Sequence, residues 1–125
     1  MPDLYQETII EEFKYPRNKG TLANADQVLH GENASCGDEL TIYLKVNVQN
    51  QIEQLQWEGN GCAISQAAMS LLSKYILSHQ LTLSEIQNLN QETLLELLGL
   101  GEINPGREKC LMIALSTLQK AVPKR

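Results

Sequence analysis

Hydrophobic and polar positions follow three successive patterns along this chain. Residues 3–14 space their apolar side chains near a helical period, which predicts a first helix that ends before Pro16. On this helix we expect Glu12 to lie on a solvated face. Between residues 26 and 58 the period falls to two, as in strands that bury one face. After residues 59–61 (Gly-Asn-Gly) the period is helical again, so helices should form the rest of the fold.

The strand region predicts a small antiparallel sheet. Residues 41–48 give the clearest strand, because apolar and polar positions alternate and the residues have high β propensity. Its inward face is expected to carry Ile42, Leu44, Val46 and Val48. Residues 49–51 favour a turn, and residues 52–58 the returning strand of a hairpin. A shorter strand over residues 27–30 is expected to pair with the hairpin, which gives about three strands.

Four helices are predicted after the hairpin. An apolar stripe between Ile64 and Ile76 marks the first of them. Residues 82–85 (Thr-Leu-Ser-Glu) fit a capping box that opens a short helix, and residues 90–98 make another, closed by a glycine. Residues 107–122 form the last helix, which a proline stops.

These elements predict the α+β class in the order α-β-β-β-α-α-α-α, with the helices packed on one face of the sheet. No repeat or linker divides the 125 residues, so we expect a single domain over residues 1–125. A net charge of −5 argues against nucleic-acid binding, which needs a basic surface. No apolar run is long enough to span a membrane, and the acidic start is unlike a secretory signal. We therefore expect a cytoplasmic protein that binds neither nucleic acid nor membrane.

The three cysteines lie where predicted elements meet. An odd, sparse count without a secretory signal excludes a disulfide scaffold. Cys36 lies in a loop of small residues before the long strand, whereas Cys62 and Cys110 lie near predicted helix N-termini, which stabilise thiolates. Arg107 and Lys109 add positive charge beside Cys110 and are expected to lower the pKa of its thiol. The pattern points to thiolate chemistry in a reducing compartment.

Asp38 follows Cys36 by two positions, and in extended backbone two such residues point the same way. Three thiolates and one carboxylate make four ligands, enough for tetrahedral zinc or for the terminal positions of a 2Fe–2S cluster. The harder oxygen ligand favours a labile centre. Neither His30 nor His79 lies near a cysteine in the sequence, so neither is expected to be a ligand. The alternative is three unrelated buried thiols, since free cysteine is often buried.

Four segments carry a resemblance to a known family. They are residues 9–20 (Ile-Ile-Glu-Glu-Phe-Lys-Tyr-Pro-Arg-Asn-Lys-Gly), 33–38 (Asn-Ala-Ser-Cys-Gly-Asp), 59–65 (Gly-Asn-Gly-Cys-Ala-Ile-Ser) and 109–110 (Lys-Cys). With these segments in this order, the chain resembles, over nearly its whole length, the U-type iron–sulfur cluster assembly proteins, the IscU, NifU and SufU group. The resemblance implies an α+β fold with one exposed site, and a pyridoxal-phosphate cysteine desulfurase as the sulfur-donating partner. It implies as metal or cluster ligands Cys36, Asp38, Cys62 and Cys110.

The resembled family has two branches, and the resemblance is closer to the SufU branch than to the scaffold (IscU) branch. Lys109 stands where scaffold (IscU) members have a histidine, and residues 103–107 (Ile-Asn-Pro-Gly-Arg) replace their Leu-Pro-Pro-Val-Lys chaperone segment. The Gly-Cys-Ala-Ile-Ser motif around Cys62 and the basic residues before Cys110 are similar to the SufU branch. SufU members usually carry an insertion between these two cysteines, and the interval between Cys62 and Cys110 is too short for all of it. This feature favours the IscU branch.

Each branch implies a different use of the same four residues. In the SufU reading the site binds zinc and Cys36 accepts sulfane sulfur as a persulfide, so the chain acts as a sulfurtransferase. In the IscU reading the chain is a non-enzymatic scaffold that binds iron, assembles a labile 2Fe–2S cluster and passes it to apo-proteins, with Cys110 as the sulfur acceptor. Arg107 and Lys109 are candidates for residues beside the site. A third reading is a structural zinc module without transfer chemistry.

Overall fold

The computed structural model describes residues 3–34 and 37–123, and within them the order of helices and strands is the predicted one. The α+β class is therefore confirmed. A single turn of 3₁₀ helix, η1, precedes the last helix. The elements are α1 (Asp3–Lys14), β1 (Gln27–Asn33), β2 (Asp38–Val46), β3 (Ile52–Asn60), α2 (Ala63–His79), α3 (Leu83–Gln87), α4 (Gln91–Leu98), η1 (Pro105–Arg107) and α5 (Glu108–Leu118).

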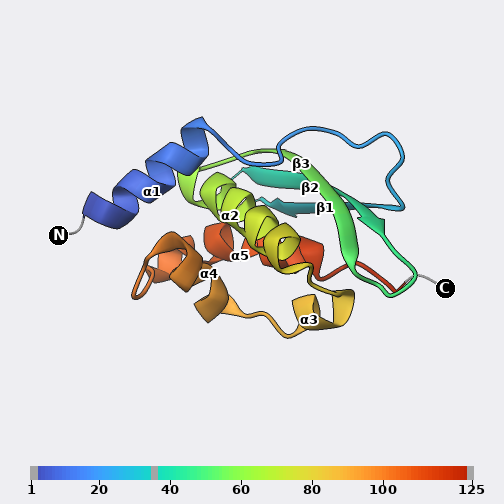
Figure 1. The fold of residues 1–125 in the computed structure, drawn as a ribbon. Helices are drawn as coiled ribbons and strands as arrows, with labels where there is room; N and C mark the ends of the chain where they lie inside the picture. Colours follow the sequence, from blue (N-terminus) through green and yellow to red (C-terminus); the bar gives the residue numbers. More distant parts are fainter. Residues whose placement is uncertain (1–2, 35–36, 124–125) are drawn as a thin grey trace.

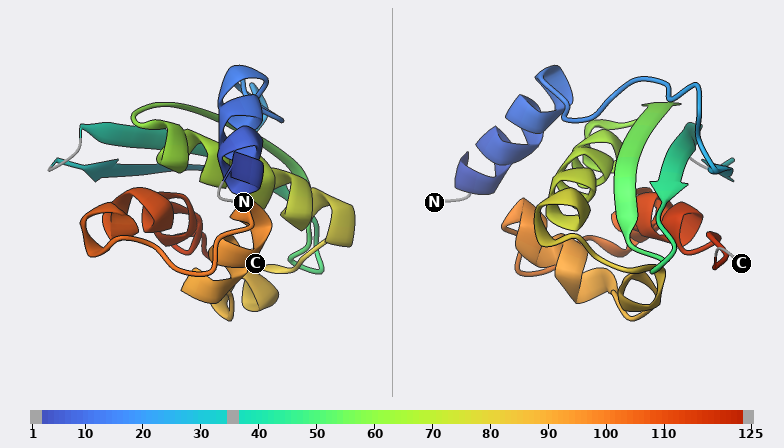
Figure 2. Two further views of the ribbon diagram at one scale, coloured as in Figure 1. Left: turned by 90° about the vertical axis from the view of Figure 1, so that its left-hand side faces the viewer. Right: turned by 45° about the vertical axis from the view of Figure 1, so that its right-hand side comes forward.

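The three strands form one antiparallel sheet in the order β1-β2-β3. Figure 1 and Figure 2 show α2 and α5 on the same side of this sheet. Along β2, buried and partly exposed residues alternate, because successive side chains of a strand point to opposite faces. The inward face packs on the two helices and forms the core. Its largest fully buried side chains include Trp57, Leu40, Ile42, Leu44, Leu55, Met69, Leu72, Ile76 and Leu111.

A buried carboxylate on α1 joins this helix to the rest of the fold. Glu12 is only 6% exposed, and its Oε1 accepts a 2.6 Å hydrogen bond from the hydroxyl of Ser70 in α2. The guanidinium Nε of Arg17 lies 3.3 Å from both carboxylate oxygens. Ile10 and Phe13 are instead about half exposed. The expectation of a solvated Glu12 is wrong, because a hydroxyl donor and a cation compensate its removal from water.

Two segments cover the edges of the sheet. The chain after α1 runs beside β3, where the Trp57 amide donates to the Asn18 carbonyl (3.0 Å) and the Gly20 amide donates to the Trp57 carbonyl (2.7 Å). At the other edge, the amide and carbonyl of Val122 both bond to the side chain of Gln27 in β1. The last helix therefore ends at Leu118, earlier than predicted, because this pairing needs a non-helical chain.

The long strand also ends earlier than its alternation predicted. Val48 is 86% exposed and lies outside β2, in the turn that leads to β3. Oδ1 of Asn47 accepts hydrogen bonds from the amides of Gln49 (2.8 Å) and Gln51 (3.0 Å), which closes this turn. An asparagine side chain that bonds to the backbone two residues on competes with strand pairing. The apolar pattern at 48 therefore continues past the end of the strand.

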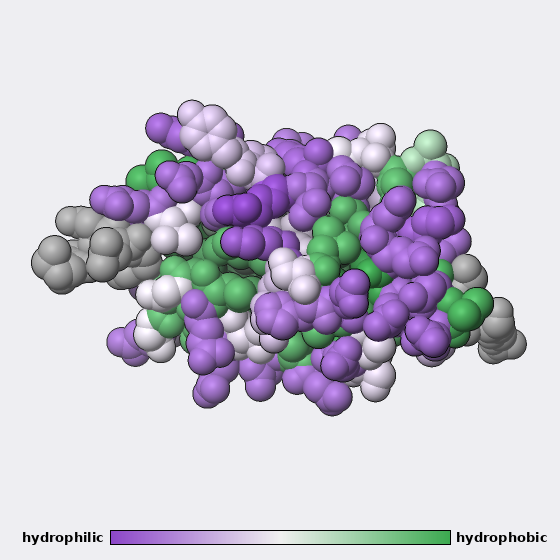
Figure 3. Space-filling view, in the orientation of Figure 1, coloured by the Kyte–Doolittle hydropathy of each residue, from purple (hydrophilic) through white to green (hydrophobic). Residues whose placement is uncertain are grey.

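The predicted capping box of Thr82 and Glu85 opens α3, and Gly99 ends α4 in the left-handed conformation, as expected. Asn90, predicted as the first residue of α4, is instead its N-cap. In the space-filling view, hydrophilic side chains cover most of the face shown and hydrophobic ones lie in separate patches among them (Figure 3). Within residues 3–34 and 37–123, no helix has the length and apolar character needed to cross a membrane.

Candidate metal centre

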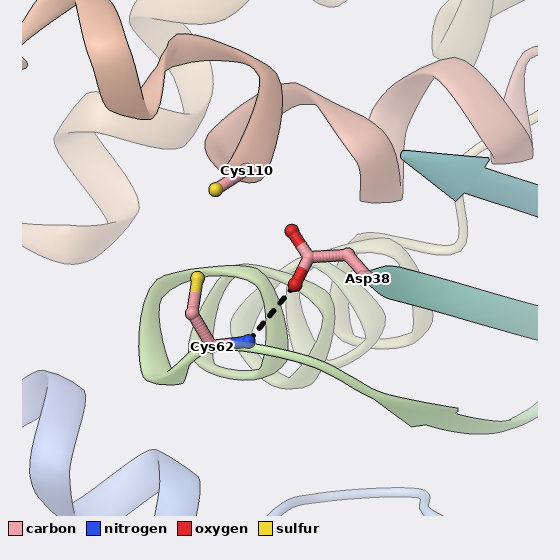
Figure 4. A group of neighbouring side chains, drawn as sticks. All are labelled: Asp38, Cys62 and Cys110. Atoms are coloured by element: carbon pink, nitrogen blue, oxygen red, sulfur yellow. Dashed lines mark hydrogen bonds between the residues drawn. The ribbon is translucent and has the colours of Figure 1, made fainter. Parts of the chain in front are cut away.

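Three of the four predicted ligands meet at one end of the fold. Asp38 is the first residue of β2, Cys62 is the N-cap of α2, and Cys110 lies in the first turn of α5. One ligand atom from each lies within 4.8 Å of the others. Figure 4 shows the three side chains pointing from a strand and two helices into one common space. The structure thus brings together residues from distant parts of the sequence.

The sheet register explains why these positions meet. Glu39 of β2 pairs with Asn60 of β3, so the start of β2 lies beside the end of β3. The chain then turns at Gly61 and enters α2 directly after Cys62. Helix α5 packs against α2, β1 and β2, which places Cys110 over the same end. Each ligand is therefore held by regular structure, and the site is fixed by the packing of three elements.

Burial differs among the three side chains. Asp38 is 2% exposed and Cys110 is 1% exposed, whereas Cys62 is half-buried. Cys62 lies at the N-terminal end of α2, as its N-cap residue. Of these three side chains, Cys62 is the one that solvent reaches.

The carboxylate of Asp38 has one satisfied oxygen and one unsatisfied oxygen. Oδ1 accepts a 2.9 Å hydrogen bond from the backbone amide of Cys62. Oδ2 is buried and has no hydrogen-bond partner among the residues that the structure describes. A buried polar atom without a partner costs about 1–3 kcal/mol, so such an atom in a native fold calls for an explanation. A cation bound between Asp38 and the two thiols supplies one.

The donor set fits a thiophilic divalent metal. Two thiolates and one carboxylate oxygen are typical ligands for zinc, and iron also accepts them. Ligand atoms bound tetrahedrally to one zinc at about 2.0–2.3 Å lie about 3.5–3.8 Å apart. The ligand atoms of Asp38, Cys62 and Cys110 lie within 4.8 Å of one another. The three residues can thus hold zinc if these atoms close in by up to about 1 Å, with a fourth ligand still to be supplied.

Cys36, the predicted fourth ligand and persulfide acceptor, lies outside the described residues. Its role therefore stays a prediction. The expectation of extended backbone between Cys36 and Asp38 is wrong, because Gly37 has φ +71°, in the left-handed region. Residues two apart then need not point the same way.

Arg107 and Lys109, the candidates beside the site, are both exposed. Lys109 lines a cavity of about 470 Å³ between α5 and the end of β1, together with Met112, Thr117 and Lys120. Their expected effect on the thiol of Cys110 stays a prediction. His30 and His79 are not part of the cluster of candidate ligands found among the described residues. Nε2 of His30 lies instead 3.5 Å from Oε2 of Glu32, and Nδ1 of His79 lies 3.0 Å from the carbonyl oxygen of Tyr75.

Sequence reasoning missed one residue of this site. Gly61 has φ +151°, and a β-carbon there would overlap Oδ1 of Asp38. The available signal was a glycine directly before a candidate ligand. That signal predicts close approach of the backbone to another group, and here the group is the carboxylate.

Residues 4–124 match the NifU-like N terminal domain. An iron–sulfur cluster assembly scaffold protein IscU from Thermotoga maritima is 31% identical, over 97% of this chain and 94% of that protein. A zinc-dependent sulfurtransferase SufU from Bacillus subtilis is 30% identical, over 97% of this chain and 90% of that protein.

Solved structures agree with these sequence matches. The crystal structure of a putative iron–sulfur cluster assembly scaffold protein for the SUF system from Fervidobacterium islandicum has a TM-score of 0.77 to this chain. It is 28% identical, and the match covers 92% of this chain and 93% of that one. Sequence and fold agree over nearly the full length, and the chain belongs to the NifU-like N-terminal domain family.

Proposed function

We propose that this protein serves iron–sulfur cluster assembly as a zinc-dependent sulfur acceptor. It receives sulfane sulfur from a pyridoxal-phosphate cysteine desulfurase at a site formed by Cys36, Asp38, Cys62 and Cys110. The observation that carries the proposal is the convergence of Asp38, Cys62 and Cys110 within 4.8 Å. Relatives named zinc-dependent sulfurtransferase and cluster assembly scaffold support this class of function.

The transfer step uses a thiolate of this chain as the nucleophile. The Cys36 thiolate attacks the outer sulfur of the persulfide on the desulfurase cysteine. A new S–S bond forms on Cys36 while the S–S bond on the desulfurase breaks, and the desulfurase cysteine leaves as a thiolate. Asp38, Cys62 and Cys110 would hold a zinc ion, which would keep the thiols that bind it deprotonated. Cys36 would have to leave the metal before it reacts.

Burial favours Cys36 over Cys110 as the acceptor in this proposal. Cys110 is 1% exposed, so a partner's persulfide cannot reach its sulfur without movement of α5 or its neighbours. Nucleophilic attack needs both a thiolate and access. The choice of Cys36 also agrees with the sequence, which predicts a loop of small residues there, since loops often carry functional groups.

The second candidate function is a scaffold on which a labile 2Fe–2S cluster is assembled and passed to apo-proteins. The relatives named IscU favour it. The same four residues would bind iron and accept sulfide, with Cys110 as the first sulfur acceptor. A structural zinc module is the weaker alternative, because the half-buried Cys62 leaves the group less closed than such a site.

Metal analysis combined with a desulfurase assay tests the proposal. Protein purified under reducing conditions is expected to contain about one zinc per chain. This zinc form should stimulate alanine release from cysteine by a cysteine desulfurase of the same organism, with each such enzyme assayed in turn. Cys36→Ala should abolish the stimulation, and Ser35→Ala, at the preceding position in the sequence, should retain it.

The other outcomes overturn the proposal in distinct ways. A stable visible chromophore formed with iron and sulfide in zinc-free protein, without stimulation by the zinc form, shows a scaffold. Retained zinc without stimulation or chromophore shows a structural zinc module. Wild-type metal content in Asp38→Ala and in each cysteine-to-alanine variant shows unrelated buried thiols.

A further inference from the structure

The start of β2 and the turn before α2 approach each other unusually closely. Asp38 is buried beneath residues 61–62, and its Oδ1 lies 2.9 Å from the Cys62 amide nitrogen. Cys62 is the N-cap of α2 and makes no side-chain cap hydrogen bond. The amide groups of a helix N-terminus need acceptors from outside the helix. Here the Asp38 carboxylate, from a strand, supplies one of them.

This approach depends on the missing side chain at position 61. A β-carbon on Gly61 would overlap Oδ1 of Asp38 and lie 2.9 Å from both its Cγ and the Ser65 Oγ. Real β-carbons essentially never come within 3.0 Å of such atoms. The backbone at position 61 also has φ +151°, a value that residues other than glycine rarely adopt. Any residue but glycine must therefore displace the carboxylate or change the turn.

The hydrogen bond decides which carboxylate oxygen remains for a ligand. With Oδ1 on the Cys62 amide, Oδ2 is buried and has no partner among the described residues. Figure 4 shows this second oxygen on the side of the carboxylate that is turned toward Cys110. The carboxylate is thus fixed in rotation, with one oxygen used by the backbone and one directed at the thiols.

We propose that Gly61 is a positioning residue for the metal centre. It lets the Cys62 amide hold Oδ1 of Asp38, so that Asp38 offers a single oxygen, Oδ2, to the metal. Because Cys62 also provides a sulfur ligand, its amide and its thiol orient two neighbouring ligands together. This inference rests on the proposed metal site. It assigns a role to a residue that offers no ligand atom itself.

Cobalt(II) binding to the metal-free protein tests this role. The intensity of the thiolate-to-cobalt absorption band per bound cobalt reports the number of sulfur ligands. Gly61→Ala should keep the wild-type intensity per cobalt, since the cysteines remain. Its cobalt affinity should fall by about 10- to 100-fold, as is usual when a group that orients a ligand is lost. Gly101→Ala is the matched control, because position 101 is exposed and a β-carbon there meets nothing within 4 Å.

A double-mutant cycle separates positioning from simple strain in the turn. If Gly61 acts through the carboxylate, Gly61→Ala should lower affinity much less in an Asp38→Ala background than in the wild type. An equal loss in both backgrounds overturns the proposal. The same cycle is run on urea unfolding of the metal-free proteins, so that a poorly folded single variant still gives a result.

The two readouts also distinguish this proposal from the proposed function. Failure of the wild-type protein to bind cobalt or zinc contradicts the metal site and leaves the unfolding cycle to test Gly61. Non-additive unfolding energies for positions 38 and 61 show that Gly61 acts through the Asp38 carboxylate, and additive energies overturn the positioning role. Metal binding with wild-type affinity in Gly61→Ala overturns the positioning role and leaves the metal site standing.

Discussion

The hydroxyl of Ser70 in α2 donates a 2.6 Å hydrogen bond to the buried carboxylate of Glu12 in α1. The same Ser70 Oγ accepts a 2.8 Å hydrogen bond from the backbone amide of Arg17. One small side chain therefore holds both the first helix and the turn that follows it. The guanidinium of Arg17, which lies near the Glu12 carboxylate, partly neutralises its charge.

Ser70→Ala should loosen the attachment of α1. The substitution leaves the Glu12 carboxylate with Arg17 alone and removes the acceptor of the Arg17 amide. Loss of a hydrogen bond to a charged, buried group costs about 1.5–3 kcal/mol of unfolding free energy, which urea denaturation measures. Ser78→Ala, at an exposed position of the same helix, is the control and should change stability little. Equal urea midpoints for the two variants would show that Ser70 does not anchor α1.

Gly31→Ala should destabilise the contact between β1 and α5. A β-carbon at 31 would overlap Oγ1 of Thr117, and the backbone at this glycine does not have a positive φ. The effect is therefore steric, with a cost of about 1–3 kcal/mol for overpacking. Thr117→Ala removes the overlapping hydroxyl, so the double variant should lose less stability than the two single variants together. Additive losses in thermal or urea unfolding would exclude a direct clash.

Tyr43 should titrate at higher pH than an ordinary tyrosine. Its hydroxyl donates a 2.7 Å hydrogen bond to Oε1 of Glu58, and this bond, with desolvation and the charge of Glu58, raises the pKa of Tyr43 above 10.0. The folded protein thus holds the phenol proton more tightly than the unfolded chain. The resulting stabilisation is fully present below pH 10 and is lost as the pH rises through the raised pKa.

Glu58→Gln should lower the pKa of Tyr43 toward its ordinary value. The Tyr43 titration is isolated by ultraviolet difference spectra against Tyr43→Phe, measured in both backgrounds. Glu53→Gln, at the other end of β3, should leave it unchanged. An unchanged titration in Glu58→Gln would mean that the hydrogen bond does not raise the pKa.

Periodicity and cap chemistry predicted most of the fold because both act locally. The first helix follows from its apolar spacing and the proline after it, and the capping box of Thr82 bonds to a residue only three positions away. The prediction that Asp38, Cys62 and Cys110 converge came from the motifs that resemble a family. The separations of these residues in the sequence did not predict it, because the sheet register and helix packing bring them together.

Three features that sequence reasoning missed depend on partners distant in the chain, whereas the early end of β2 follows from the local hydrogen bonds of Asn47. Glu12 is buried because Ser70 and Arg17 contact its carboxylate, and the helical pattern around residue 12 does not include these partners. The last helix ends early because Val122 pairs with Gln27. The space that Gly61 leaves for Asp38 exists only after β2 and β3 have paired. In each case a tertiary contact overrides a local preference.

Removal of metal should lower the thermal stability of the protein. A metal held by Asp38, Cys62 and Cys110 would join β2, α2 and α5 and give Oδ2 of Asp38 the partner that it lacks among the described residues. A ligand that binds only the folded state adds about 4 kcal/mol at 1,000 times its Kd. Calorimetry should therefore show that a strong chelator lowers the Tm of the zinc-loaded wild type and of Ser116→Ala, an exposed control on α5. The Tm of Cys62→Ser should be the same with and without chelator. An equal fall in Tm in the wild type, Ser116→Ala and Cys62→Ser would contradict a metal at this site.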